Sequence, residues 1–160
     1  MPETLDLREE HPAYLCGRLL AVYESIQYSS AGETKVNQTV ADRYYSLAST
    51  CPGLAFPKLA DLGQKHLRKL RRDKRGAMIR LEEQLQDILG GIERKAGCQF
   101  PPRLDLDEQG RFVLGYHHQR AAHMAGAKAH KLKQAQAADT QEEPVIDTES
   151  VIETESEEEK

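Results

Sequence analysis

The hydrophobic positions of the chain recur at helical spacing, and no segment alternates as a β-strand would. A first helix is predicted from about residue 12 to 27, because Pro12 suits a first turn. Its predicted buried face consists of Leu15, Leu19, Val22, Tyr23 and Ile26. A second helix is predicted to open at the capping residue Asn37 and to end at Cys51-Pro52-Gly53. It is predicted to present Val40, Tyr44 and Leu47 on one face.

Three more helices follow the same period. The third is predicted to begin at Pro57, to bury Leu59, Leu62, Leu67 and Leu70, and to stop before Gly76. The fourth has the cleanest apolar arc, formed by Met78, Leu81, Leu85, Ile88, Leu89 and Ile92, and Gly90-Gly91 is expected to weaken its end. The fifth is predicted to be capped by Asp107, to carry Phe112, Val113 and Tyr116, and to reach about Ala138. The predicted fold class is therefore all-α, a compact bundle of about five helices.

Charge divides the 160 residues into two parts. Residues 139–160 hold ten acidic residues and one lysine, a net charge of −9, and few apolar side chains. We expect this segment to be a disordered acidic tail, because it cannot bury enough apolar surface to offset the entropy of ordering. Residues 1–138 hold 21 Lys or Arg and 16 Asp or Glu, a net charge of +5, so the predicted bundle domain is basic.

Composition excludes some classes of protein. No apolar run is long enough to span a membrane, and the first residues lack the order of a signal peptide, so a soluble cytoplasmic protein is expected. The three cysteines, Cys16, Cys51 and Cys98, lie far apart without a C-x-x-C pair. This spacing favours reduced, structural cysteines over a zinc site or a disulfide framework.

A dense run of cations lies in the third predicted helix. Between Gln64 and Arg75 the only acid is Asp73, and the cations are Lys65, Arg68, Lys69, Arg71, Arg72, Lys74 and Arg75. Helical spacing places the leucines on one side and most of the cations on the other. Such a row can follow a phosphate backbone without reading its sequence. The alternatives are a solvated face or an acidic protein partner, and the acidic tail is itself a candidate partner.

The segment YHHQRAAH is the natural place to look for catalysis or metal binding. His117 and His123 are six residues apart, whereas two helical metal ligands are usually four apart, and no nearby acid completes a set. We therefore expect no metal, no cofactor and no enzymatic activity. Packing or a surface polar contact is favoured for His117 and His118, and a nucleic-acid contact by His118 or Arg120 is the sharper alternative.

Three long segments carry a family resemblance: HPAYLCGRLLAVYESIQ, FPKLADLGQKHLRKLRRDKRG and LDLDEQGRFVLGYHHQR. In this order and spacing they resemble the C-terminal region of the type I-C CRISPR large-subunit family, over about residues 11–131. In that family the same region is also translated from an internal start as a separate small subunit of the Cascade complex, and Met1 fits such a product. The acidic tail falls outside the family pattern.

The resemblance implies a non-catalytic helical subunit present in more than one copy. It would lie beside the backbone and large subunits, the guide RNA (crRNA) and the target DNA, and would stabilise the R-loop and the displaced non-target strand. Cleavage would belong to a separately recruited helicase-nuclease. The implied phosphate contacts are Lys65, Arg68, Lys69, Arg71 and Arg72, followed by Lys74, Arg75 and Arg120. A structural adaptor without nucleic-acid contact and a metal-dependent hydrolase remain alternatives.

Overall fold

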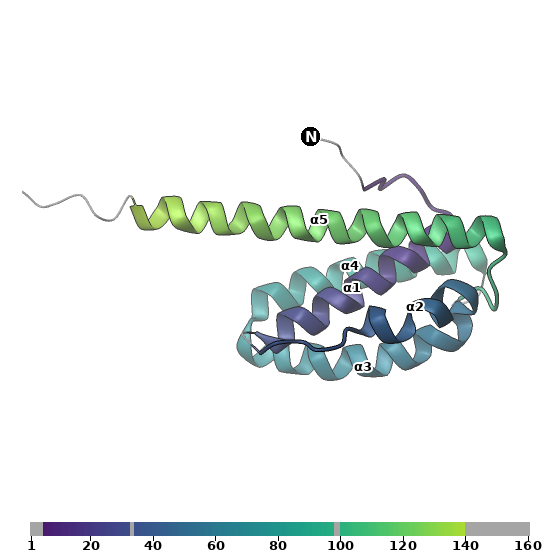
Figure 1. Cartoon of the computed structure of the whole chain (residues 1–160), viewed down its shortest axis with the longest axis horizontal. Helices are drawn as coiled ribbons and strands as arrows, with labels where there is room; N and C mark the ends of the chain where they lie inside the picture. The colour runs from purple at the N-terminus through teal and green to yellow at the C-terminus, as the bar shows by residue number, and fades with distance from the viewer. Residues whose placement is uncertain (1–4, 33, 98–99, 140–160) are drawn as a thin grey trace, which may run out of the picture. The chain divides into compact units, whose positions relative to one another are not determined.

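The computed structural model describes residues 5–32, 34–97 and 100–139, and these form five helices without a strand. In chain order the helices are α1 (Pro12–Ala31), α2 (Val40–Thr50), α3 (Pro52–Asp73), α4 (Arg75–Ala96) and α5 (Leu106–Asp139), as Figure 1 shows. The predicted all-α fold of about five helices is confirmed.

The chain divides into two compact units, Met1–Ala127 and Lys128–Lys160. The first contains α1 to α4 and residues 106–127 of α5, about six turns, and the second is described over residues 128–139, the last turns of α5. The predicted tail from residue 140 onward lies outside the described residues, so the boundary placed at residue 138 stays a prediction.

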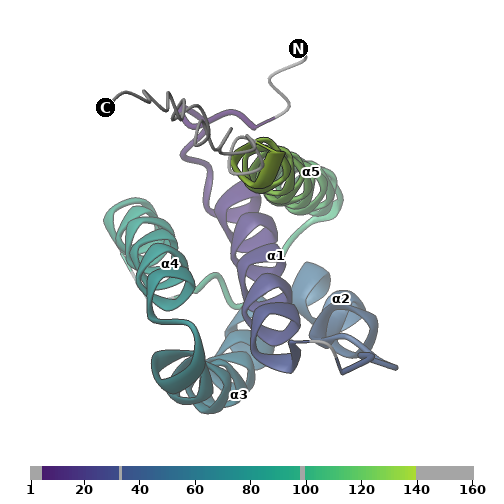
Figure 2. The same ribbon diagram turned by 90° about the vertical axis from the view of Figure 1, so that its left-hand side faces the viewer.

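Helix α1 is the centre of the first unit, with the other helices arranged around it (Figure 2). Its predicted apolar face is buried as expected, and the buried surface extends almost round the helix. Because neighbours cover α1 on several sides, some of its polar side chains are also buried, including Glu24 at 4% exposure. A buried carboxylate needs hydrogen-bond partners, and those partners come from α5.

Two predicted boundaries near the start of the chain are wrong. Helix α1 continues to Ala31, four residues past the predicted end. Helix α2 is capped by Thr39 and not by Asn37. The Thr39 hydroxyl accepts from the Asp42 backbone N–H at 3.0 Å, and the Asp42 carboxylate accepts from the Thr39 N–H at 2.8 Å. This reciprocal capping box satisfies two backbone donors, which a lone cap at Asn37 would not do.

The third helix starts one turn earlier than predicted. Pro52 begins α3 and Pro57 lies inside it, so Cys51-Pro52-Gly53 is a junction between two helices and not a loop. Pro52 fits because a first-turn residue has no use for its N–H. The helix ends at Asp73, and the chain turns at Lys74, with φ −148° and ψ 66°, directly into α4. Gly76 lies within α4, which ends at the left-handed Gly97 with φ 63°.

The fifth helix begins at Leu106, and Asp105 replaces the predicted cap Asp107. The Asp105 carboxylate accepts from the Glu108 N–H at 2.9 Å, and the Glu108 carboxylate accepts from the Asp105 N–H at 2.8 Å. Phe112 and Tyr116 are buried, whereas Val113 is 38% exposed because it lies on the side of α5 turned away from α1.

Candidate nucleic-acid interface

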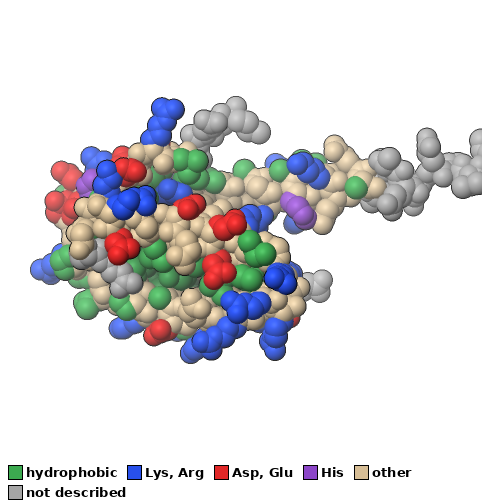
Figure 3. Space-filling model, turned by 180° about the vertical axis from the view of Figure 1, so that it is seen from behind, with side chains coloured by type: hydrophobic (Ala, Val, Ile, Leu, Met, Phe, Trp, Pro, Cys, Tyr) green, Lys and Arg blue, Asp and Glu red, His purple; other side chains and the backbone are tan. Residues whose placement is uncertain are grey.

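The predicted cations form one continuous surface, which we call the basic stripe. It comprises Lys65, Arg68, Lys69, Arg71 and Arg72 of α3, Lys74 at the turn and Arg75 at the start of α4, and all seven are exposed. Figure 3 shows Lys and Arg side chains gathered along this edge of the bundle. The opposite face of α3 buries Phe56, Leu59, Leu67 and Leu70, so the core fixes which way the cations point.

The basic stripe lacks neutralising partners. Within the described part of the chain, the ion pairs are Lys95–Glu10, Arg111–Glu9 and Arg120–Glu24, and none involves the stripe. The positive charge of the stripe also acts on the neighbouring His66. The pKa of His66 is lowered mainly by burial and further by the charge of Lys69. Uncompensated charge of one sign attracts anions and releases their counterions on binding.

The backbone under the basic stripe is held in place. Ser30 Oγ of α1 lies 2.7 Å from His66 Nδ1 of α3, and the single-residue turn at Lys74 leaves little slack between α3 and α4. From Lys65 to Arg72 the stripe runs about 10 Å along the helix axis. That length corresponds to about three phosphate spacings along one strand of B-form DNA.

Arg120 is not part of the basic stripe. It lies on α5, and residues 106–127 of α5 lie across α1 from α3 (Figure 2). Its Nε is 3.7 Å from Oε2 of the buried Glu24, which also accepts a hydrogen bond from the Tyr116 hydroxyl at 2.9 Å. Burial and the charge of Glu24 both raise the pKa of Tyr116. The structure thus gives Arg120 a partner within the bundle, and its predicted phosphate contact stays a prediction.

A polar seam between α1 and α5 was missed by the sequence reasoning. Tyr14 Oη lies 3.0 Å from His118 Nδ1, Arg18 Nε donates to Gln119 Oε1 at 3.0 Å, and Ser25 Oγ contacts His123 Nδ1. The contact of His118 agrees with the packing alternative, while its nucleic-acid alternative stays a prediction. The signal in the sequence was the presence of polar residues such as Arg18 and Ser25 within the otherwise apolar α1.

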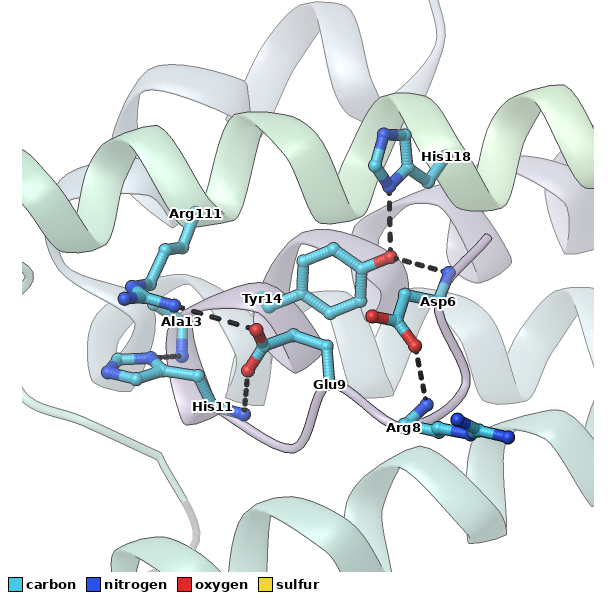
Figure 4. Close-up of polar contacts among 8 residues, drawn as sticks. All are labelled: Asp6, Arg8, Glu9, His11, Ala13, Tyr14, Arg111 and His118. Atoms are coloured by element: carbon cyan, nitrogen blue, oxygen red, sulfur yellow. Dashed lines mark hydrogen bonds and ion pairs between the residues drawn. The ribbon is translucent and has the colours of Figure 1, made fainter. Parts of the chain in front are cut away.

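The segment that precedes α1 contacts both α1 and α5 near Tyr14 and His118 (Figure 4). The Asp6 N–H donates to the Tyr14 hydroxyl at 3.2 Å, and the Glu9 carboxylate accepts from the His11 N–H at 2.9 Å. Arg111 of α5 lies 3.5 Å from the same Glu9 carboxylate. These contacts tie residues 6–11 to both α1 and α5.

Residues suited to metals or catalysis are dispersed. No group of three or more His, Cys, Asp or Glu side chains that suits a metal ion exists among the described residues. Cys16 is buried, which raises the pKa of its thiol to about 12, and Cys51 is a half-buried free thiol. Cys98 lies outside the described residues. The expectations of no metal and no enzymatic activity stay predictions.

Comparison with known proteins supplies the family. None of the helices in the described part is both long and apolar enough for a membrane span. No curated protein matches the chain. Residues 1–124 match the family described as CRISPR-associated protein (Cas_Csd1), which covers well over half of the 160 residues and includes the whole basic stripe. The chain therefore belongs to the CRISPR-associated Csd1 family.

Proposed function

We propose that this protein is a non-catalytic small subunit of a type I-C CRISPR surveillance complex (Cascade) in the cytoplasm. More than one copy would assemble with the backbone and large subunits, the crRNA and the target DNA. The subunit would stabilise the R-loop and the displaced non-target strand. The observation that carries the proposal is the basic stripe in a member of the Csd1 family. Its seven cations are exposed, and none forms an ion pair with a described residue.

The physics of RNA-guided recognition fits this role. Base pairing with the guide RNA reads the target sequence, so the surrounding protein has to supply shape and positive charge. A displaced single strand presents a row of phosphates, and a rigid row of arginine and lysine side chains can neutralise several of them together. We expect binding that is indifferent to sequence and strongly dependent on salt.

The test is target-DNA binding by the reconstituted complex. In the stripe variant Lys65, Arg68, Lys69, Arg71 and Arg72 are all changed to alanine, and equal incorporation into the complex is confirmed first. DNA affinity and the slope of its salt dependence should both fall, since about 0.7 counterions are released per phosphate contact on a single strand. A matched control removes five exposed cations elsewhere: Lys35, Arg43, Arg94, Arg103 and Lys131. Equal affinity of the stripe variant and the wild type would contradict the proposal.

A structural adaptor is the second candidate, and one observation favours it. On α5, Leu106 is 83% exposed, Leu114 53% and Met124 66%, so an apolar face is available for a protein neighbour. If the basic stripe meets acidic protein surface, the double change Arg68→Glu and Arg72→Glu should abolish assembly. If assembly survives while DNA binding is lost, the adaptor reading is wrong.

A further inference from the structure

A second group of arginines lies where α1, α4 and α5 meet, apart from the basic stripe. Arg18 of α1 donates from Nε to Gln119 Oε1 of α5 at 3.0 Å, and Gln119 Nε2 lies 2.9 Å from His123 Nε2. The amide oxygen Oε1 of Gln84, on α4, lies 2.8 Å from the same histidine nitrogen. Arg80 lies one turn before Gln84 on α4, so both project from the same face of that helix.

His123 links the three helices through both of its ring nitrogens. Arg18 can only donate, so Gln119 accepts with its oxygen and presents its NH₂ group to His123. His123 Nε2 lies between this NH₂ group and the Gln84 amide oxygen, and Nδ1 lies beside Ser25 Oγ. The pKa of His123 is about 4, so the imidazole is uncharged at neutral pH, and the charged groups of the junction are Arg18, Arg80 and Asp87.

The junction has an excess of positive charge. Burial, followed by the charges of Arg80 and Arg18, lowers the pKa of His123 to about 4. Asp87 is the acidic group that acts on Arg18, but neither arginine forms an ion pair with any described residue. Arg18 is half-buried, and its Nε donates to Gln119. Neither terminal nitrogen of Arg18 has a hydrogen-bond partner among the described residues, so both remain for a ligand.

We propose that Arg18 and Arg80 form a second phosphate-binding site for a nucleic-acid strand, with Gln119 as the positioning residue for Arg18. This inference rests on the proposed function and adds a contact outside the basic stripe. Guanidinium groups suit phosphate because they stay charged and offer two parallel donors. Gln119 is 2% exposed and holds the Arg18 side chain before the ligand arrives, which reduces the entropy lost on binding.

The cleanest test is Arg80→Gln, since Arg80 is exposed and its removal leaves the hydrogen-bonded chain intact. Affinity of the full-length protein for fluorescent single-stranded DNA is measured by anisotropy over a salt series. Arg80→Gln should weaken binding about threefold and reduce the salt slope by about 0.7. Arg94→Gln removes an exposed cation from the other end of α4 and should leave both unchanged. Equal effects of the two substitutions would overturn the site.

Arg18→Lys tests the positioning claim. The charge remains, but the Nε donor to Gln119 and the two-pronged contact with phosphate are lost, so binding should weaken although circular dichroism shows the helical content of the wild type. Binding equal to wild type would overturn the role of Arg18. Inorganic phosphate at constant ionic strength separates the two sources of the ligand: the inference fails if Arg80→Gln changes phosphate binding and leaves DNA binding unaltered.

The stripe variant, measured in parallel, separates this inference from the proposed function. Loss of DNA binding in the stripe variant with no effect of Arg80→Gln retains the function and rejects the second site. An effect of Arg80→Gln without an effect of the stripe variant retains the second site and rejects the assignment of the basic stripe.

Discussion

Single residues of α1 decide how α5 is held against the bundle. Glu24 is 4% exposed, and its carboxylate has the Tyr116 hydroxyl and the Arg120 guanidinium as partners. Because Arg120 is 46% exposed and 3.7 Å away, the buried Tyr116 is the closer source of compensation. The cost of burying the carboxylate is therefore offset mainly by one hydroxyl group.

Tyr116→Phe should accordingly lower the free energy of unfolding by about 1–3 kcal/mol, because it leaves a buried carboxylate short of a donor. Urea unfolding followed by circular dichroism measures the change. Tyr28→Phe is the control, since Tyr28 is 47% exposed and its hydroxyl can bond to water. Equal stability of Tyr116→Phe and wild type would mean that Arg120 alone satisfies Glu24.

His123 makes stability depend on pH. Its folded-state pKa of about 4 lies below the ordinary value of 6.5, so the unfolded chain binds the proton first as pH falls. The contribution of His123 is complete above pH 6.5 and is lost progressively as pH falls to about 4. Carboxylates also titrate near pH 4 and change the stability of any variant. The effect of His123 is therefore isolated by comparing the wild type with His123→Asn at each pH. The difference in unfolding free energy between the wild type and His123→Asn should shrink from pH 7.5 to pH 4.5. A difference that stays constant over this range would contradict the lowered pKa of His123.

At the level of helices, α1 and α5 cross at two glycines. A Cβ at Gly17 would overlap the Phe112 carbonyl oxygen, and one at Gly115 would overlap the Tyr14 carbonyl oxygen. The obstacle is backbone in both cases, so a rotamer change of a side chain cannot relieve it. This close approach brings the facing polar side chains within hydrogen-bond distance, and the polar seam depends on it.

Gly17→Ala and Gly115→Ala should each destabilise the protein by about 1–3 kcal/mol, as expected for overpacking. Gly110→Ala and Gly126→Ala are matched controls in α5, since a Cβ at either position meets no atom within 4 Å. The controls should gain up to about 1 kcal/mol, because alanine favours helix. Thermal unfolding distinguishes the two sets, and a neutral Gly17→Ala would refute the close crossing.

Helical spacing predicted the existence of all five helices and the outward orientation of the basic stripe. Both follow from the period of the leucines, which the structure confirms at Leu59, Leu67 and Leu70. The ends were harder to predict because they depend on reciprocal caps and on contacts distant in sequence. The start of α3 illustrates this, since Gly53 N–H donates to Pro101 O at 3.0 Å. The junction of Arg18 and Arg80 joins three helices, and a periodic pattern within one helix cannot locate it.

For the whole molecule, the distribution of charge matters more than its total. The net charge of −4 would predict poor affinity for nucleic acid, yet residues 1–138 carry +5. Residues 140–160 hold nine acidic residues and one lysine, and so contribute −8. Under the proposed function, this negative charge would repel a nucleic-acid strand bound to residues 1–138 over about one Debye length, roughly 10 Å at 0.1 M salt.

Replacing those nine acidic residues by their amides should therefore raise the affinity for single-stranded DNA several-fold at low salt, because the repulsion between tail and phosphates is removed. The gain should vanish near 1 M salt, where the Debye length falls to about 3 Å. Changing Val145, Ile146, Val151 and Ile152 to alanine alters the same segment without altering its charge, and should leave DNA affinity unchanged. A salt-independent gain, or an equal gain in this control, would show that the segment acts through something other than its charge.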